Sequence, residues 1–259
     1  MIYKGCLISH GGKVRQNNED NGFLDGAWRS NDKKFAWKYG CEKKDNLLCG
    51  VFDGVGGEDC GEVASRLAAE ALFSFNETGF QKDGFDLYVL KANEQILSAP
   101  ESSRMASTFV ILSIENNQYY FCNMGDSRAY LFRKGKLIQI SKDHNMVRQL
   151  VEEGILTPEQ AVGHPDLHTI YQYLGMKSGT GEEELILEPY CLEAIPSKDG
   201  DICLLCTDGL TDMVEDEDIA QILSENQDIE EKTKCLLESA LEHGGRDNIT
   251  VLLVEAKCL

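Results

Sequence analysis

Residues Leu47 to Gly57 read LLCGVFDGVGG and form the most informative segment of the chain. An apolar run, Leu47 to Phe52, ends in the acid Asp53 and breaks into glycines before a helical pattern begins near Glu58. Glycine lets the backbone approach a neighbouring group closely, and a carboxylate beside exposed carbonyls suits a hard cation such as Mg²⁺ or Mn²⁺. Taken alone, the segment is more simply interpreted as an Asp-Gly turn between a strand and a helix.

The composition indicates a globular chain with an acidic surface. A chain of 259 residues is long enough for one large domain or two small ones. Apolar residues make up 42% of it, which is typical of a globular protein. The net charge of −19 makes nucleic acid and anionic membranes poor partners. No apolar run approaches the ~20 residues of a membrane span, and we find no signal peptide at the N-terminus.

Ten cysteines are scattered mostly through apolar segments, as at Cys49, Cys122, Cys203 and Cys206. This placement indicates reduced core residues rather than a zinc or redox motif, and it predicts a cytoplasmic protein.

Strand and helix patterns alternate in clusters along the chain. Helical spacing covers 58–75, 85–97, 146–151, 217–223 and 229–241. Strand patterns cover 2–9, 20–28, 47–52, 106–114, 119–124, 128–132, 137–140, 185–192, 201–206 and 248–255. Residues 29–45 have no clear period and are expected to form a hairpin tip or surface loop.

The hairpin turns between strands, such as the one at Glu115-Asn116-Asn117-Gln118, imply antiparallel pairing. We therefore predict an α+β fold, a four-layer α-β-β-α sandwich of two packed, mainly antiparallel sheets flanked by helix pairs. A single domain is expected to span residues 1–259. Within it, the polar region at about 145–181 is predicted to be a mobile flap, in which Thr157 to Gln160 has the signature of a helix start.

Six acids lie where these patterns break: Glu19, Asp20, Asp53, Asp126, Asp208 and Asp247. Each one alone is typical of a helix cap or an Asx turn. Asp53 and Asp208 share a more specific context, because each follows an apolar strand and precedes a glycine. If such strand ends converge, the carboxylates repel one another strongly unless metal ions neutralise them.

These segments resemble the metal-dependent protein phosphatases, the type 2C serine/threonine phosphatases. The similar motifs are GKVRQNNED at 12–20, VFDGVGG at 51–57 with GEVAS at 61–65, MASTFV at 105–110, NMGDSRAYL at 123–131, LLCTDGLTDMV at 204–214 and GGRDNITVLLV at 244–254. Each motif alone is weak, but six in order over nearly the whole chain are specific. The compact length and the double glycine resemble bacterial members.

The resemblance implies a role for each matching residue. Asp53 would bridge two Mn²⁺ or Mg²⁺ ions, with the Gly54 carbonyl on one of them, and Asp208 and Asp247 would complete the other. Glu19 and Asp20 would hold metal-bound waters or touch the second ion, and Arg15 would bind the substrate phosphate. Asp126, with Asp208 and Asp212, would form a weaker third site, and Asn248 would support Asp247.

Such a centre would hydrolyse phosphoserine and phosphothreonine through a water activated between two cations. Oxygen donors without cysteine or histidine favour Mg²⁺ or Mn²⁺ over zinc. The chain departs from the family at Val55, where some members carry a histidine proposed as the general acid. A metal-bound water, or His164 or His168 in the flap, could supply that proton instead. A structural turn at His164 and an exposed His168 are the alternative interpretation.

The expected partners are phosphorylated proteins, with a Ser/Thr kinase of the same organism and its substrates as candidates. The alternative is a non-catalytic phosphoprotein-binding module of the same fold. Such a module could afford to lose the acids, and all of them are present here. A nucleotide phosphohydrolase is not favoured, because a phosphate-cradling G-x-x-x-x-G-K loop is missing.

Overall fold

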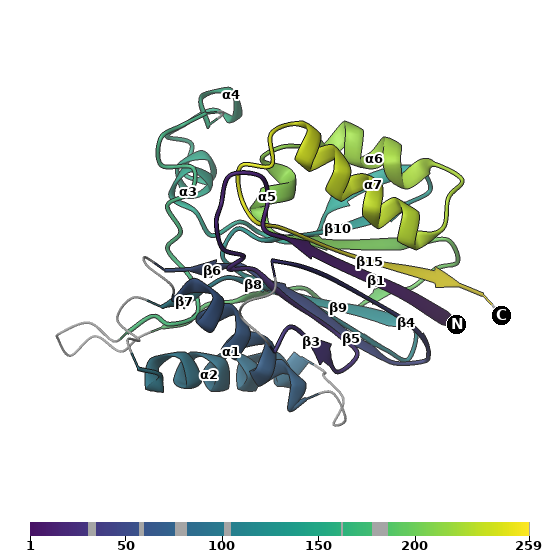
Figure 1. Ribbon diagram of the computed structural model, residues 1–259, viewed down its shortest axis with the longest axis horizontal. Coiled ribbons are helices and arrows are strands. Elements are labelled where there is room, and N and C mark those ends of the chain that lie inside the picture. The colour runs from purple at the N-terminus through teal and green to yellow at the C-terminus, as the bar shows by residue number, and fades with distance from the viewer. Residues whose placement is uncertain are drawn as a thin grey trace.

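Two large sheets lie face to face, with helices on both outer sides (Figure 1). The structure is a computed structural model that describes residues 1–30, 35–56, 60–75, 82–100, 105–161, 163–177 and 186–258. Every strand pairing within the two sheets is antiparallel. The predicted α+β, four-layer sandwich is confirmed.

The first sheet has six strands in the order β11-β10-β14-β15-β1-β4. Their bounds are β11 (Lys136–Gln139), β10 (Arg128–Arg133), β14 (Ile202–Cys206), β15 (Ile249–Lys257), β1 (Ile2–His10) and β4 (Ala36–Lys44). The neighbouring strands β1 and β15 join the two ends of the chain, because they pair from Ile2 opposite Lys257 to His10 opposite Ile249. The N- and C-termini therefore lie side by side (Figure 1).

The second sheet has seven strands, six of them in the order β12-β9-β8-β5-β2-β3, with β13 also on β9. Their bounds are β12 (Tyr190–Cys191), β9 (Gln118–Met124), β8 (Phe109–Glu115), β5 (Leu47–Phe52), β2 (Asn21–Leu24), β3 (Ala27–Trp28) and β13 (Ile195–Pro196). A short separate ribbon pairs β6 (Gly54–Val55) with β7 (Ala106–Ser107).

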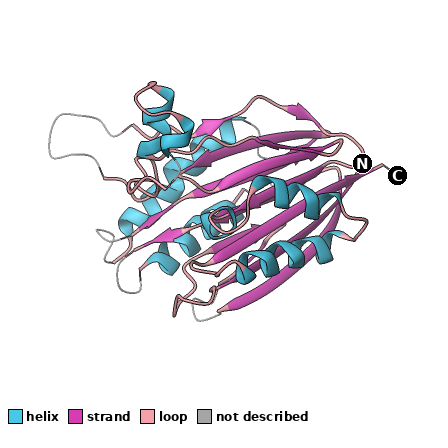
Figure 2. Cartoon of the chain, turned by 90° about the horizontal axis from the view of Figure 1, so that it is seen from above, coloured by secondary structure: helices cyan, strands magenta, loops and turns pink. Residues whose placement is uncertain are grey.

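Helices cover the outer face of each sheet. α1 (Gly61–Phe73) and α2 (Lys82–Ser98) cover the seven-stranded sheet, and α5 (Asp208–Thr211), α6 (Asp216–Ser224) and α7 (Ile229–Glu242) cover the six-stranded one. Figure 2 shows helices lying along the strands that they cover. α3 (Met146–Glu152) and α4 (Pro158–Ala161) project from one end of the sandwich. None of the helices in the described ranges is long and apolar enough to cross a bilayer.

Three apolar layers hold the four structural layers together, and β5 contributes to two of them. Leu47, Cys49 and Val51 face the core between the sheets, whereas Leu48 and Phe52 face α1 and α2. Alternate residues of a strand point to opposite faces, so a strand in the middle of a sandwich must be apolar throughout. This requirement explains why the strand that delivers Asp53 is a continuous apolar run.

The main error of the sequence prediction is β4. Residues 29–45 were expected to form a hairpin tip or surface loop, but Ala36–Lys44 form an edge strand of nine residues paired with β1. Trp37 and Cys41 are half-buried against the core, and most of the other side chains are exposed. An edge strand is held mainly by backbone hydrogen bonds to one neighbour, so it needs little apolar periodicity. Residues 31–34 lie outside the described residues.

Other boundaries also differ. The single strand expected at 20–28 is a hairpin, because Asp25 and Gly26 turn the chain with φ of 50° and 85°. The strand expected at 185–192 reduces to β12 among the described residues, and the short helix α5 was not predicted. The expected helix start near Glu58 lies outside the described residues, and α1 begins at Gly61.

The prediction that Cys122 is a reduced core residue is wrong. Cys122 on β9 forms a disulfide with Cys191 on β12, which lies directly opposite in the sheet. Spacing could not reveal this pair, because 69 residues separate the two cysteines along the chain. The other eight cysteines are free. The helix start in the flap has the expected form, since Thr157 and Gln160 bond each other's backbone N–H.

Candidate active site

Acids from distant parts of the chain meet at one end of the sandwich. Asp53 follows β5, Asp126 follows β9, Asp208 opens α5 after β14, and Asp247 precedes β15. They line a cleft of about 560 Å³. The described residues around this cleft are Arg15, Glu19, Asp53, Gly54, Val55, Gly56, Asp126, His168, Ile170, Asp208, Asp212, Asp247 and Asn248.

Both Asp-Gly pairs have a steric explanation. A Cβ at Gly54 would collide with the backbone oxygens of Gly61 and Glu19, and a Cβ at Gly209 would collide with the backbone of Asn248. Close approach of backbone to backbone is the property that glycine alone provides. The glycine after each acid therefore allows two chain segments to pack directly behind the carboxylates.

Asn248 ties the first motif to the last. Its side-chain oxygen accepts from the Glu19 N–H at 2.7 Å, and its Nδ2 donates to the carbonyls of Gly11 and Asn17. Its own N–H donates to Asp247 Oδ1 at 2.8 Å. This side chain satisfies three buried or half-buried backbone groups and so holds Glu19 beside Asp247. The family resemblance implied only a support of Asp247 for this residue, and the bonds to Glu19, Gly11 and Asn17 are additional.

Thr108 holds the turn at Asp53. Its backbone N–H donates to the Asp53 carbonyl at 2.9 Å, and its hydroxyl accepts from the Asp53 N–H at 3.2 Å. The hydroxyl also lies 2.7 Å from Ser127 Oγ, next to Asp126. Thr108 therefore links the corners that carry the two acids.

Arg15 is the cationic side chain on the described cleft wall. Its Nη2 donates to Asp247 Oδ2 at 2.6 Å, and its side chain is 55% exposed. The carboxylate bond raises the pKa of Arg15, so the guanidinium stays charged at every physiological pH. One arginine faces five aspartates and one glutamate along the described wall, so the acidic side chains greatly outnumber the cationic ones.

This crowding changes the protonation of the acids. Burial first, and then the neighbouring carboxylates, raise the pKa of Asp208 to about 8 and that of Asp126 to about 6. The pKa of Asp53 is raised well above its usual range for the same two reasons, with Asp208 the largest neighbouring charge. These carboxyl groups cannot all ionise unless a positive charge lies among them. Such a cluster is therefore suited to binding a cation.

Asp20 and Asp212 occupy different environments. Asp20 is buried behind the cleft, where its Oδ2 accepts from the hydroxyls of Thr207 and Thr250 at 2.8 Å each. Burial raises its pKa to about 8. Asp212 lies on the cleft wall with a half-exposed carboxylate. The structure thus brings all the predicted acids to one region, with Asp20 in a supporting position.

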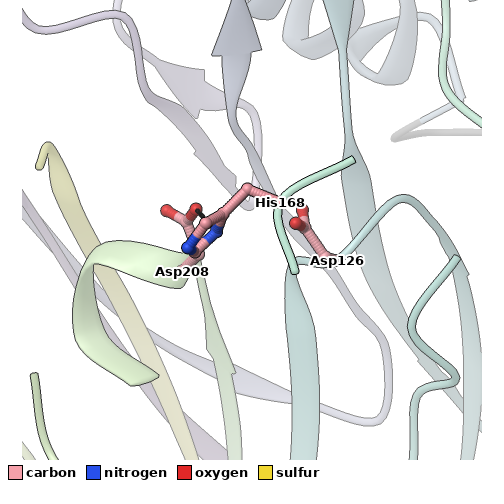
Figure 3. A group of neighbouring side chains, drawn as sticks. All are labelled: Asp126, His168 and Asp208. Atoms are coloured by element: carbon pink, nitrogen blue, oxygen red, sulfur yellow. Dashed lines mark ion pairs between the residues drawn. The ribbon is translucent and has the colours of Figure 1, made fainter. Parts of the chain in front are cut away.

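The two flap histidines lie in different places. His168 reaches over the cleft, with Nδ1 3.8 Å from Asp208 Oδ2 and Nε2 3.7 Å from Asp212 Oδ2 (Figure 3). His164 instead accepts from the Asp166 N–H within its own turn. The structural-turn interpretation therefore describes His164, whereas His168 is both exposed and close to the acids. Val55 is 48% exposed at the cleft and has no proton to donate.

The donor set fits divalent cations that prefer oxygen. Asp53, Asp208 and Asp247 offer carboxylate oxygens from separate segments, and the repulsion among them would be relieved by positive charge. The described cleft wall contains no cysteine, which argues against a thiolate zinc site.

Comparisons with known proteins agree with this chemistry. A family model described as protein phosphatase 2C matches residues 5–150. The chain is 32% identical over 256 residues to the serine/threonine phosphatase stp of Listeria welshimeri, covering 94% of this chain and 92% of the relative. It is 34% identical over 265 residues to the serine/threonine protein phosphatase PstP of Mycobacterium tuberculosis, covering 98% of this chain and 45% of that longer relative.

Solved structures show the same fold. A crystal structure of the Mycobacterium tuberculosis serine/threonine phosphatase PstP/Ppp superimposes with a TM-score of 0.82 at 32% identity, covering the whole of both chains. The catalytic domain of PstP in complex with two manganese ions superimposes with a TM-score of 0.78 at 32% identity, again over both chains in full.

Proposed function

The chain belongs to the protein phosphatase 2C family, and we propose that its acidic cleft hydrolyses phosphoserine and phosphothreonine in proteins. The observation that carries the proposal is the convergence of Asp53, Asp208 and Asp247 on one cleft beside Arg15. These residues come from segments far apart in the sequence, and a role in folding alone does not explain so much uncompensated charge at one point.

Members of this family depend on metal ions, and the cleft acids are the residues that would hold them here. We assign Asp53, Asp208, Asp247 and the Gly54 carbonyl to a pair of Mn²⁺ or Mg²⁺ ions, with Glu19 and Asp20 in support. Asp126 and Asp212 are assigned with Asp208 to a weaker third position. When bound, the pair of cations supplies a deprotonated water as nucleophile and neutralises charge on the phosphoryl group.

The chain itself orients the substrate. Arg15 is held at the cleft by Asp247, and its exposed guanidinium presents a planar set of N–H donors that match two phosphoryl oxygens. Charge on those oxygens is stabilised by donors that are already in place before the substrate binds. The Asp247 bond also fixes the distance between Arg15 and the cation ligands. Arg15 therefore serves as the phosphate-binding residue.

The test is release of phosphate from a phosphothreonine peptide with Mn²⁺. The wild-type chain should turn over, Asp53→Asn should lose activity, and Asp218→Asn, on the exposed face of α6, should match wild type. Arg15→Lys should chiefly raise KM, because lysine keeps the charge but not the planar pair of donors. Turnover by Asp53→Asn equal to that of wild type would refute the assignment.

Phosphorylated proteins are the substrate class, and a Ser/Thr kinase of the same organism and its targets are the partners we propose. A cytoplasmic location remains a prediction from the sequence. The non-catalytic binding module is not favoured, because every predicted site acid is present and all of them except the buried Asp20 lie with Arg15 on the cleft wall.

A further inference from the structure

His168 brings a nitrogen donor from the flap to the acid cluster. One ligand atom each from Asp126, His168 and Asp208 lie within 4.8 Å of one another (Figure 3). The approaches of His168 to Asp208 at 3.8 Å and to Asp212 at 3.7 Å are too long for hydrogen bonds. Donors around an octahedral ion at about 2.1 Å lie about 3 Å apart when adjacent and about 4.2 Å apart when opposite.

A separate observation is a small cavity among these groups. It has a volume of about 30 Å³, and Asp126, His168, Asp208 and Asp212 are on its wall. A cavity needs roughly 10–15 Å³ to hold one water-sized particle. The wall also contains Arg128, but this guanidinium donates from Nε and Nη2 to the Asp143 carboxylate at 2.7–3.2 Å and so is already neutralised.

We propose that His168 is a flap ligand of a cation bound by Asp126 and Asp208, and that it makes this position selective for Mn²⁺ or another transition ion over Mg²⁺. The proposal rests on the assignment of the cleft acids as cation ligands made above, and it adds a donor of a different class. Imidazole suits transition metals, whereas Mg²⁺ prefers oxygen donors and keeps its waters.

The backbone around His168 is tied to the corner that carries Asp126. The Tyr171 N–H donates to the His144 carbonyl, and the Met146 N–H donates to the Thr169 carbonyl, both at 2.9 Å. His144 in turn exchanges hydrogen bonds with Gly125, whose N–H donates to His144 Nδ1 at 3.2 Å. This chain of contacts holds the backbone next to His168 beside the corner next to Asp126 without any cation. Binding of an ion would therefore cost little rearrangement of the backbone.

A cation held in this way connects the flap to the ends of the strands. Asp126 follows β9 and Asp208 follows β14, so the ion would join both sheets to the turn that carries His168.

The experiment is pulsed electron paramagnetic resonance of Mn²⁺ added in excess to the whole chain. Wild type should show ¹⁴N modulation from a directly bound imidazole, and His168→Gln should lose it. His164→Gln is the matched control, since His164 lies in the same flap but away from the cleft, and it should retain the signal. Circular dichroism of each variant checks that the fold is intact.

Calorimetry provides a second measurement. His168→Gln should weaken the lowest-affinity Mn²⁺ site about 10- to 100-fold, since even outer ligands of a metal contribute that much, and should change Mg²⁺ binding by less. Absence of ¹⁴N modulation in wild type, or its survival in His168→Gln, would overturn the proposal. If that happened while phosphate release still depended on Asp53, the phosphatase function would stand. Full activity of Asp53→Asn would overturn the function instead.

Discussion

Replacing Asp208 with asparagine should stabilise the metal-free protein at neutral pH. The folded state raises the pKa of Asp208 to about 8, from an ordinary value of 3.8, because the carboxyl is buried among other carboxylates. In the unfolded protein at pH 7 this carboxyl is ionised, because the pH lies about three units above its ordinary pKa. Folding must protonate it, at a cost of about 1.4 kcal/mol for each of those units. Asparagine avoids this cost, so the expected gain is about 4 kcal/mol.

The pH dependence follows from the sign of the shift. A carboxyl whose pKa is raised on folding destabilises the folded state increasingly as pH rises from its unfolded value of 3.8 toward its folded value of about 8. The advantage of Asp208→Asn should therefore grow by about 1.4 kcal/mol per pH unit across this window.

The assay is urea unfolding with a chelator present, monitored by tryptophan fluorescence from about pH 5 to about pH 8. Excess Mn²⁺ should reverse the order of stability, because wild type gains binding free energy that the variant cannot. Asp218→Asn on exposed α6 is the control and should follow wild type. A metal-free Asp208→Asn protein less stable than wild type at pH 7, or an advantage independent of pH, would refute the reasoning.

Three further changes test the supports of the site. Asn248→Ala should lower the free energy of unfolding, measured with urea, by about 3 kcal/mol, because three backbone groups lose their hydrogen-bond partner. A loss below about 1 kcal/mol would contradict this role of Asn248. Gly54→Ala should cost about 3 kcal/mol and weaken Mn²⁺ binding in calorimetry, since the new methyl meets backbone. Its control, Gly135→Ala, meets open space and should cost about 1 kcal/mol through its φ of 74° with Mn²⁺ binding unchanged. Cys191→Ser should lower the free energy of unfolding by about 2–4 kcal/mol, because it removes a disulfide between cysteines 69 residues apart in the chain. Equal unfolding midpoints for wild type with and without a reductant would argue against the disulfide.

Several features of the fold were predictable because they depend on local sequence. The apolar run of β5, the spacing of α1 and α7 and the turn at Asn116 and Asn117 each follow from burial of a face or from a left-handed turn. β4 was missed for the converse reason. It is an edge strand whose exposed, polar side chains carry little signal of the backbone pairing with β1.

The same division applies to the site. Local context distinguished Asp53 and Asp208, since each follows an apolar strand and precedes a glycine, and the family resemblance supplied the roles of the other acids. It could not show that Asp20 lies behind the cleft on Thr207 and Thr250. Nor could it separate His168, which meets the acids, from His164, which closes its own turn.

The sequence by itself determined most of the strands and helices, the family motifs and the identity of the acids. Those properties depend on side-chain type and on spacing over a few residues. Only the tertiary structure decided which groups meet: Asn248 with Glu19, Cys122 with Cys191, and His168 with Asp126 and Asp208. Such contacts join residues tens to hundreds of positions apart, and their geometry is set by the packing of the two sheets. In the segment Leu47 to Gly57, the acid was evident from the start, and its counterparts became visible only where the strand ends converge.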